Sequence, residues 1–279
     1  MLRVLDAVRS GSDRPAPPVR MWVGACIVAS FVLVAVFAPL LSPYDPLAQD
    51  PANSLASPST AHLLGTDQLG RDVFSRLLHA ARIDLLVGFL GALLPAVLGT
   101  VLGALAAYRG RWWDSAIMRT ADVVQAFPTY ILIIALVFVL GQGLPAILVA
   151  FTVAAWVVYA RLMRTEALRV RSMDYVDAAR AGGLPGWRIL WRHVFPNAAG
   201  QTVVYLPSDI VIATLGLAGL SYLGLGIPAP TPEWGAMIAD GQIFIRDQWW
   251  LSTVPGLVVV AFGLGLSLVG EGFEEWIRR

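Results

Sequence analysis

The residues that most often perform catalysis are few in this sequence of 279 residues, and they do not group. The three histidines, His62, His79 and His193, are far apart, and no pair has the spacing of metal ligands. The single cysteine, Cys26, lies in an apolar run, where a thiol usually packs as a small hydrophobic group. No Ser/Lys, His-Glu-x-x-His or paired-Asp arrangement occurs within the apolar runs. We therefore predict no catalytic residue and no metal site in this chain.

Lysine is absent, and all twenty basic residues are arginines. A P-loop needs a lysine that reaches the β- and γ-phosphates of the nucleotide. This chain therefore lacks an ordinary P-loop, and any ATP that drives its activity must bind to another subunit. No cluster of basic residues interleaved with aromatic ones indicates binding to nucleic acid.

One carboxylate stands inside an apolar run. An ionised Asp209 at the middle of a bilayer would cost about 2.5–3.5 kcal/mol on insertion scales, so it should face protein or a wet path. Two readings stay open: Asp209 lines a translocation pathway, or it pairs with an arginine or hydroxyl of a partner subunit. Ser221, farther along the same run, is a second candidate for the pathway.

A polar, arginine-rich segment has the residues of a helical hairpin. Ser172 is expected to cap a short helix, with Asp174 near its positive end and Arg180 near its negative end. Gly183 and the glycine before it should stop this helix, and a second, amphipathic helix should begin near Trp187.

The first helix of this hairpin has an almost flat face, because Ala178 and Ala179 are small. A solvated hairpin without a partner is the simplest interpretation. It does not explain a small-residue face beside a glycine turn, against which a bulkier partner could pack.

The elements that must position these residues are membrane-spanning helices, which makes the chain all-α. The sequence is 57% hydrophobic and 14% charged, whereas soluble domains carry about 25% charged residues. About 20 apolar residues cross the hydrocarbon core, and the first run is too long for a cleaved signal peptide. We predict six spans, at residues 21–41, 85–108, 123–140, 144–159, 202–225 and 251–269.

Gly99, Gly103 and Ala107 repeat at four-residue spacing in the second predicted span. Small residues at this spacing allow two helices to approach closely. We interpret the repeat as ordinary helix packing, with a specific dimer motif as the alternative.

The arginines indicate the orientation of the spans. With the N-terminus in the cytoplasm, 16 of the 20 arginines fall in inside segments, as the positive-inside rule requires. We therefore predict both termini in the cytoplasm of a bacterial cell. The predicted parts are a tail (1–20), a first span (21–41), an outer loop (42–82), a five-helix core (83–270) with a cytoplasmic loop (161–198), and a second tail (271–279).

The hairpin resembles the EAA loop of permease subunits of ABC importers. The matching residues are Asp177, Ala178 and Ala179, followed by Gly183 and Pro196, with Asp in place of the usual Glu. The resemblance implies that this segment, including Arg180, forms a coupling helix that inserts into a groove of an ATPase subunit.

Further segments resemble permeases of the dipeptide and oligopeptide (DppC/OppC) type. They are residues 65–72, 220–226, 232–235, 249–250 and 255–256. In the first segment, a role as a gate of the pore or as a docking site for a binding protein is implied for Gly65, Thr66, Asp67, Gly70, Arg71 and Asp72, where the charged residues could instead pair among themselves. One departure is Leu217, at a position where the family commonly has Glu.

The resemblance implies a type I importer with a second homologous permease subunit, two ATPase subunits that bind ATP and Mg, and an extracytoplasmic substrate-binding protein. This chain would bind no cofactor and would contact lipid. A permease for another small solute, such as a nickel complex, is one alternative. An ion-coupled secondary transporter is the alternative from another class. Asp209 would then be the one acid available in the spans to carry a proton or bind an ion, whereas such transporters usually have several ionisable residues there.

Overall fold

The computed structural model describes residues 17–278, and within this range all regular elements are helices. Five of them are long and apolar enough to cross a membrane. These are α2 (Val19–Leu41), α3 (Val73–Arg109), α6 (Leu144–Arg171), α10 (Gly200–Tyr222) and α12 (Trp250–Arg278). The shorter helices are η1 (Pro51–Asn53), α4 (Arg111–Gln125), α5 (Thr129–Leu140), α7 (Asp174–Ala181), α8 (Gly186–Ile189), η2 (Leu190–Val194), α9 (Phe195–Ala198) and α11 (Trp234–Gln242).

The predicted third span, residues 123–140, is not one straight helix. The structure divides it between α4 and α5, which meet at an angle of 90°. Pro128 stands directly before α5, and a proline both lacks an amide donor and pushes the preceding residue out of the helical region. The prediction of a continuous helix was wrong here, and the structure reaches six spans if the bent pair counts as one.

Several helices extend beyond the apolar runs that identified them. The helix of the second span, α3, begins at Val73 within the predicted outer loop. The helix of the fourth span, α6, continues to Arg171, so the predicted cytoplasmic loop begins with helix. In the same way α12 continues through residues 271–278 of the predicted tail. Residues 1–16 and 279 of the two predicted tails lie outside the described part of the chain.

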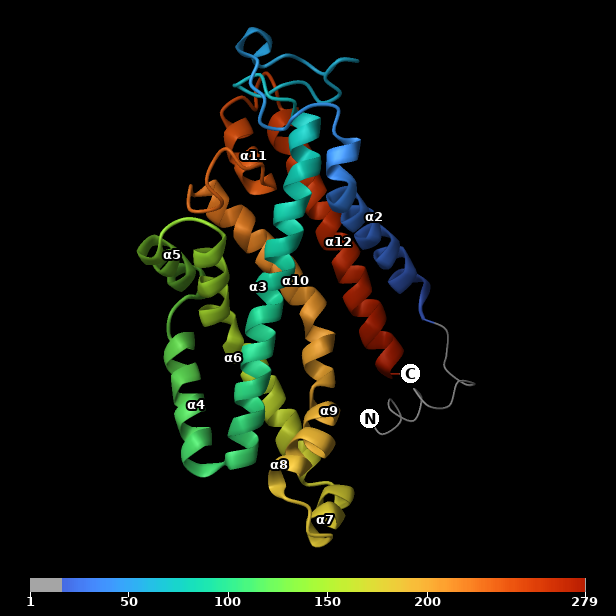
Figure 1. The fold of residues 1–279 in the computed structure, drawn as a ribbon, viewed down its shortest axis with the longest axis vertical. Coiled ribbons are helices and arrows are strands. Elements are labelled where there is room, and N and C mark those ends of the chain that lie inside the picture. The colour runs from blue at the N-terminus through green and yellow to red at the C-terminus, as the bar shows by residue number, and fades with distance from the viewer. Residues whose placement is uncertain (1–16, 279) are drawn as a thin grey trace.

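The centre of the fold is the packing of α3 on α6. A Cβ atom on Gly99 would lie 2.2 Å from the carbonyl oxygen of Trp156, and one on Gly103 would lie 2.3 Å from that of Ala160. The small-residue repeat thus allows two helices of the same chain to touch, which confirms helix packing as its role. Beside this pair, α2 packs on α12, where a Cβ atom on Gly24 would lie 2.6 Å from the Gly265 carbonyl oxygen (Figure 1).

The molecule has two distinct ends (Figure 1). The "loop end" holds residues 42–72 and α11, and the "hairpin end" holds α7 and α8. The beginning of α2 and the end of α12 both point toward the hairpin end. An ion pair of 3.4 Å between Arg20 Nη1 and Glu271 Oε2 joins them, so the described chain begins and ends on one side.

Candidate functional site

The predicted coupling segment forms the tip of the hairpin end, and the "coupling hairpin" is here residues 172–198. Asp174 and Asp177 lie in the first turn of α7, and Arg180 lies in its last turn, as the helix dipole favours. The predicted cap at Ser172 was wrong, because the residue before α7 is Met173. Since α6 continues to Arg171, the Ser172 hydroxyl donates instead to the Arg169 carbonyl at 2.9 Å.

Gly183 ends α7 as predicted. Its φ is +79°, a left-handed conformation that glycine adopts without strain. The amide of Leu184 then donates to the Ala179 carbonyl at 3.2 Å, and the amide of Gly182 donates to the Ala178 carbonyl at 2.9 Å. These bonds satisfy the last carbonyls of the helix and turn the chain back toward the membrane.

The coupling hairpin is fixed to the ends of α3 and α6 that lie at the hairpin end. Val176 is fully buried in a core cluster with residues of α3, α6, α8 and η2. Gly186 fits under Tyr108, whose hydroxyl oxygen would lie 2.1 Å from a Cβ atom at that position. Arg171 Nη1 donates to the Ala107 carbonyl of α3 at 2.9 Å. The hairpin therefore cannot move far without moving the end of α3.

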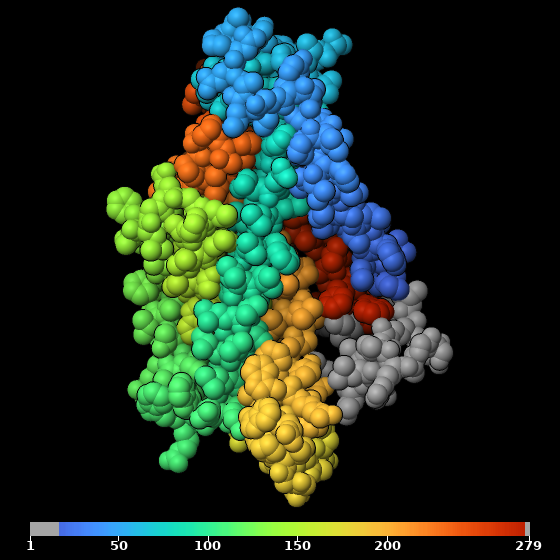
Figure 2. All heavy atoms as spheres, in the orientation of Figure 1, coloured from blue at the N-terminus to red at the C-terminus, as the bar shows by residue number. Residues whose placement is uncertain are grey.

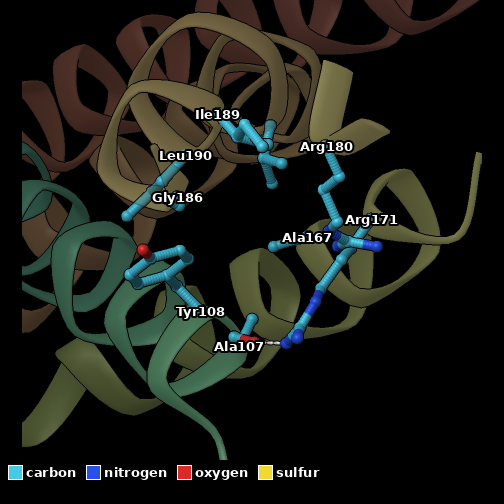
Figure 3. Close-up of a pocket in the computed structure, with 9 residues that line it drawn as sticks. Ala107, Tyr108, Ala167, Arg171, Arg180, Gly186, Ile189 and Leu190 are labelled. Atoms are coloured by element: carbon cyan, nitrogen blue, oxygen red, sulfur yellow. Dashed lines mark hydrogen bonds between the residues drawn. The ribbon is translucent and has the colours of Figure 1, made fainter. Parts of the chain in front are cut away.

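Figure 3 shows the small cavity that remains between these elements. Its volume is about 60 Å³, and Tyr108, Arg171, Arg180 and Gly186 contribute to its lining. Arg171 and Arg180 approach the cavity from the side opposite Leu190 (Figure 3). The hairpin thus contacts the ends of the long helices through a mixed apolar and cationic surface.

The exposed side chains of α7 are small or charged. Asp177, Ala178 and Arg180 are exposed, and Arg180 Nη1 donates to Asp177 Oδ1 at 2.6 Å. On the inner side, burial raises the pKa of the Tyr175 phenol, so this side chain stays neutral. The structure brings together five of the six predicted coupling residues, whereas Pro196 lies apart, exposed in the first turn of α9.

Asp67 organises the loop end. Its carboxylate accepts from Arg71 Nε at 2.7 Å and from the amides of Leu69 and Arg71 at 2.9 and 3.0 Å. Arg76 Nε lies 3.5 Å away, and both arginines are at most 4% exposed. The predicted pairing of charges within this segment is thus observed for Asp67 and Arg71.

Asp72 has a different role, because it caps α3. One carboxylate oxygen accepts from the Ser75 amide at 2.7 Å, and the other lies 2.9 Å from His62 Nδ1. Thr66 pairs with Asp72 in a short antiparallel bridge. Gly65 and Gly70 both have positive φ and approach backbone of residues 50–58. All six predicted loop residues lie together, but they are buried, so the side chains hold the loop and present no charge outside.

Asp209 and Ser221 do not form one site. They are twelve residues apart in α10, about 18 Å along a helix. Asp209 is 7% exposed and accepts from the Tyr159 hydroxyl of α6 at 2.9 Å. Its hydroxyl partner thus comes from the same chain. Ser221 Oγ is buried without a hydrogen-bond partner among the described residues.

No role of their own was predicted from the sequence for two buried acids. Asp84 and Glu233 are both fully buried, and Asp84 Oδ2 accepts from the Trp234 amide at 3.1 Å. Glu233 caps α11 by accepting from the amides of Gly235 and Ala236 at 2.7 and 2.8 Å. A carboxylate directly before the predicted second span was the available signal for Asp84.

Comparisons with known proteins assign this fold to a family. Residues 99–279 match the family model described as "Binding-protein-dependent transport system inner membrane component". Residues 20–58 match "N-terminal TM domain of oligopeptide transport permease C". A solved structure of the MetNI methionine ABC transporter, in inward-facing conformations, is similar in fold, with a TM-score of 0.57, 19% sequence identity, and coverage of 73% of this chain and 95% of that chain.

Curated relatives cover most of the chain. The dipeptide permease DppC of Alkalihalophilus pseudofirmus is 38% identical over 91% of this chain and 83% of its own length. The oligopeptide permease OppC of Bacillus subtilis is 36% identical with the same coverage. The glutathione permease GsiD of Pectobacterium atrosepticum is 37% identical over 99% of this chain and 95% of its own length. This multi-pass membrane protein therefore belongs to the family of inner membrane components of binding-protein-dependent transport systems, with the all-helical fold of a type I ABC importer permease.

Proposed function

We propose that this chain is the permease subunit of an ATP-driven importer for dipeptides or oligopeptides. The relatives named above transport a dipeptide, an oligopeptide or glutathione, and each of these cargoes contains peptide bonds. In this proposal a substrate-binding protein delivers the cargo outside the cell. A second homologous permease subunit completes the pathway, and two ATPase subunits bind ATP and Mg. The chain itself lies in the inner membrane with both termini in the cytoplasm.

The observation that carries the proposal is the coupling hairpin. Its helix α7 offers an exposed face of Asp177, Ala178 and Arg180 at the extreme tip of the molecule (Figure 1). Behind this face, the contacts at Gly186 and Arg171 fix the hairpin to the end of α3. Movement of an ATPase subunit against α7 would therefore displace a membrane-spanning helix, which is the mechanical work that the permease performs.

Matched substitutions test this interface. We expect Ala178→Arg to prevent the ATPase subunits from copurifying, because a long cation replaces a methyl group on the contact face. Ser115→Arg introduces the same side chain at an exposed position of α4 and should leave the complex intact. ATP-dependent uptake of a radiolabelled dipeptide into proteoliposomes gives the functional readout. Wild-type uptake by the Ala178→Arg variant would contradict the proposed coupling role.

The loop end has a proposed role as an outer gate or as part of the surface that receives the binding protein. Because Gly65, Thr66, Asp67, Gly70, Arg71 and Asp72 are buried, their contribution to such a surface would be to hold its shape. The exposed side chains of the same loop, including Leu63 and Leu69, are then the ones that a partner would touch.

A pathway role for Asp209 and Ser221 is also a proposal, and Asp209→Asn tests its first half. Asparagine still accepts a hydrogen bond from Tyr159, so the variant removes charge without breaking this contact. Lost uptake with an unchanged unfolding midpoint would support a role of the charge in transport. Unchanged uptake would leave Asp209 with a structural role only.

Two observations would change the proposed energy source or the proposed cargo. Uptake that requires an ion gradient instead of ATP would favour the secondary transporter. Mass spectrometry of the ligand that copurifies with the binding protein would identify the cargo, and a nickel complex there would replace the peptide as the substrate.

A further inference from the structure

A cleft opens sideways between α2 and α3 in the membrane-spanning part of the molecule. Its volume is about 470 Å³, and Ile210 of α10 with Phe262 and Leu266 of α12 are among the residues at its base. In Figure 2, atoms of α12 are visible in the gap between α2 and α3, so none of residues 17–278 closes the opening on that side. The cleft is therefore accessible to a molecule that moves within the bilayer.

Arg82 is the one charged residue in an otherwise apolar lining. Its side chain is exposed, and within residues 17–278 no hydrogen bond or ion pair reaches its guanidinium. In contrast, Arg71 and Arg76 are buried around Asp67. Since lipid hydrocarbon offers no polar partner, a guanidinium here must reach the polar boundary or bind an anion.

The position of the cleft along the helices places Arg82 near the membrane boundary at the loop end. Val36, on the α2 wall, lies five residues before the end of that helix at Leu41, which is about 7.5 Å along the helix axis. The charge is thus shallow in the bilayer, and the apolar walls continue from it toward the middle of the hydrocarbon. This is the polarity profile of one phospholipid molecule.

We propose that the cleft binds an anionic phospholipid of the surrounding bilayer. The phosphate bonds to the Arg82 guanidinium, whose planar fork of donors matches phosphate oxygens. One acyl chain lies along the apolar walls, where Val36 and Phe89 are 60% and 47% exposed in the isolated chain. A lipid chain would bury these apolar side chains, whereas water does not fill an apolar cavity of this kind.

The unpaired charge favours a lipid over a helix of another protein. A helix seated in the cleft would have to place a carboxylate opposite Arg82 to avoid burying an uncompensated cation. A phospholipid brings its anion at the required depth, because its headgroup is always at the boundary. The proposal does not depend on the identity of the cargo.

The test is native mass spectrometry of the purified transporter complex after stepwise removal of lipid by detergent. The probes are phosphatidylglycerol and phosphatidylcholine with identical acyl chains, added to the delipidated complex. We expect phosphatidylglycerol to be retained in preference to phosphatidylcholine, whose choline cation offsets the charge of the phosphate. In Arg82→Gln the retention of phosphatidylglycerol should fall by about tenfold, because a charge-assisted contact is lost. Arg246→Gln removes an exposed arginine elsewhere and should retain the lipid as the wild type does.

A second pair of variants tests the position of the acyl chain. Val36→Trp fills the cleft from α2 and should lower retention, whereas Leu33→Trp adds the same ring on α2 outside the lining and should not. Equal retention of the two lipids, or equal retention by Arg82→Gln and Arg246→Gln, would overturn the proposal. Crosslinking of a cysteine at Val36 to the second permease subunit would also overturn it, because a protein would then occupy the cleft.

Discussion

Asp84 ties α11 to α3 at a place that solvent does not reach. Its carboxylate accepts from the backbone amide of Trp234, whose indole Nε1 also donates to the Leu77 carbonyl at 3.1 Å. Glu233 satisfies the next free amides of the same helix start. Because a free helix start in an apolar setting is costly, these two acids decide whether α11 can pack at the loop end.

Replacement of Asp84 measures this contact. We expect Asp84→Ala to lower the free energy of unfolding by about 1–3 kcal/mol, because the Trp234 amide is left buried without an acceptor. Asp84→Asn keeps an acceptor oxygen and should lower the free energy of unfolding by less. The measurement is the thermal unfolding of the purified complex.

Asp122→Ala is the control for this experiment. Asp122 forms a 2.7 Å ion pair with Arg161, but its side chain is 67% exposed. Exposed pairs of this kind contribute about 0–1 kcal/mol. If Asp84→Ala and Asp122→Ala shifted unfolding equally, Asp84 would not anchor α11.

At the scale of an element, Val176 attaches α7 to the bundle. It is the one buried residue of that helix and contacts the cluster formed by the ends of α3 and α6 near the hairpin. We expect Val176→Ala to speed amide hydrogen exchange in α7 while exchange in α3 stays as in the wild type, because local opening is controlled by few apolar contacts. Leu168→Ala, at a 40% exposed position of α6, should change neither. Faster exchange throughout the core would contradict this local anchoring.

The close contact of α3 with α6 depends on glycine at position 103. An added methyl group at Gly103 meets backbone atoms of Ala160, which cannot rotate away. We expect Gly103→Ala to lower the free energy of unfolding by about 1–3 kcal/mol, the usual cost of overpacking. Gly219→Ala has open space around the new methyl group and should be neutral or slightly stabilising in thermal unfolding. If Gly219→Ala destabilised the protein more than Gly103→Ala, α3 and α6 would pack less closely than the structure shows.

Local signals in the sequence predicted some elements and missed others. The stop of α7 at Gly183 and the pairing of Asp67 with Arg71 involve residues close in sequence, so spacing alone indicated them. The predicted second span begins at residue 85, so Asp84 was not counted among its residues. Its partner Trp234 is 150 residues away, and no local pattern reports such a contact. The bend at Pro128 was missed because hydropathy measures polarity and not backbone geometry.

At the scale of the whole molecule, the orientation in the membrane is the property on which the proposed function depends. Single cysteines at positions 178 and 63, in a Cys26→Ser background, report the two ends, because Ala178 and Leu63 are both exposed. We expect a membrane-impermeant maleimide to label Leu63→Cys on intact cells and Ala178→Cys only after permeabilisation. Labelling of Ala178→Cys from outside would place α7 beyond the reach of any cytoplasmic ATPase.

The length of α3 has a mechanical consequence. This helix has 37 residues, about 55 Å of rise, while the hydrocarbon core is about 30 Å thick. It begins at the Asp72 cap on one face of the bilayer and ends beside Tyr108, which lies over Gly186 of the hairpin on the other. A tilt of about 5° around one end of such a rod would sweep its opposite end through about 5 Å. In the proposed function, a small change in the tilt of α3 at the hairpin end would therefore move its opposite end far enough to open or close a passage.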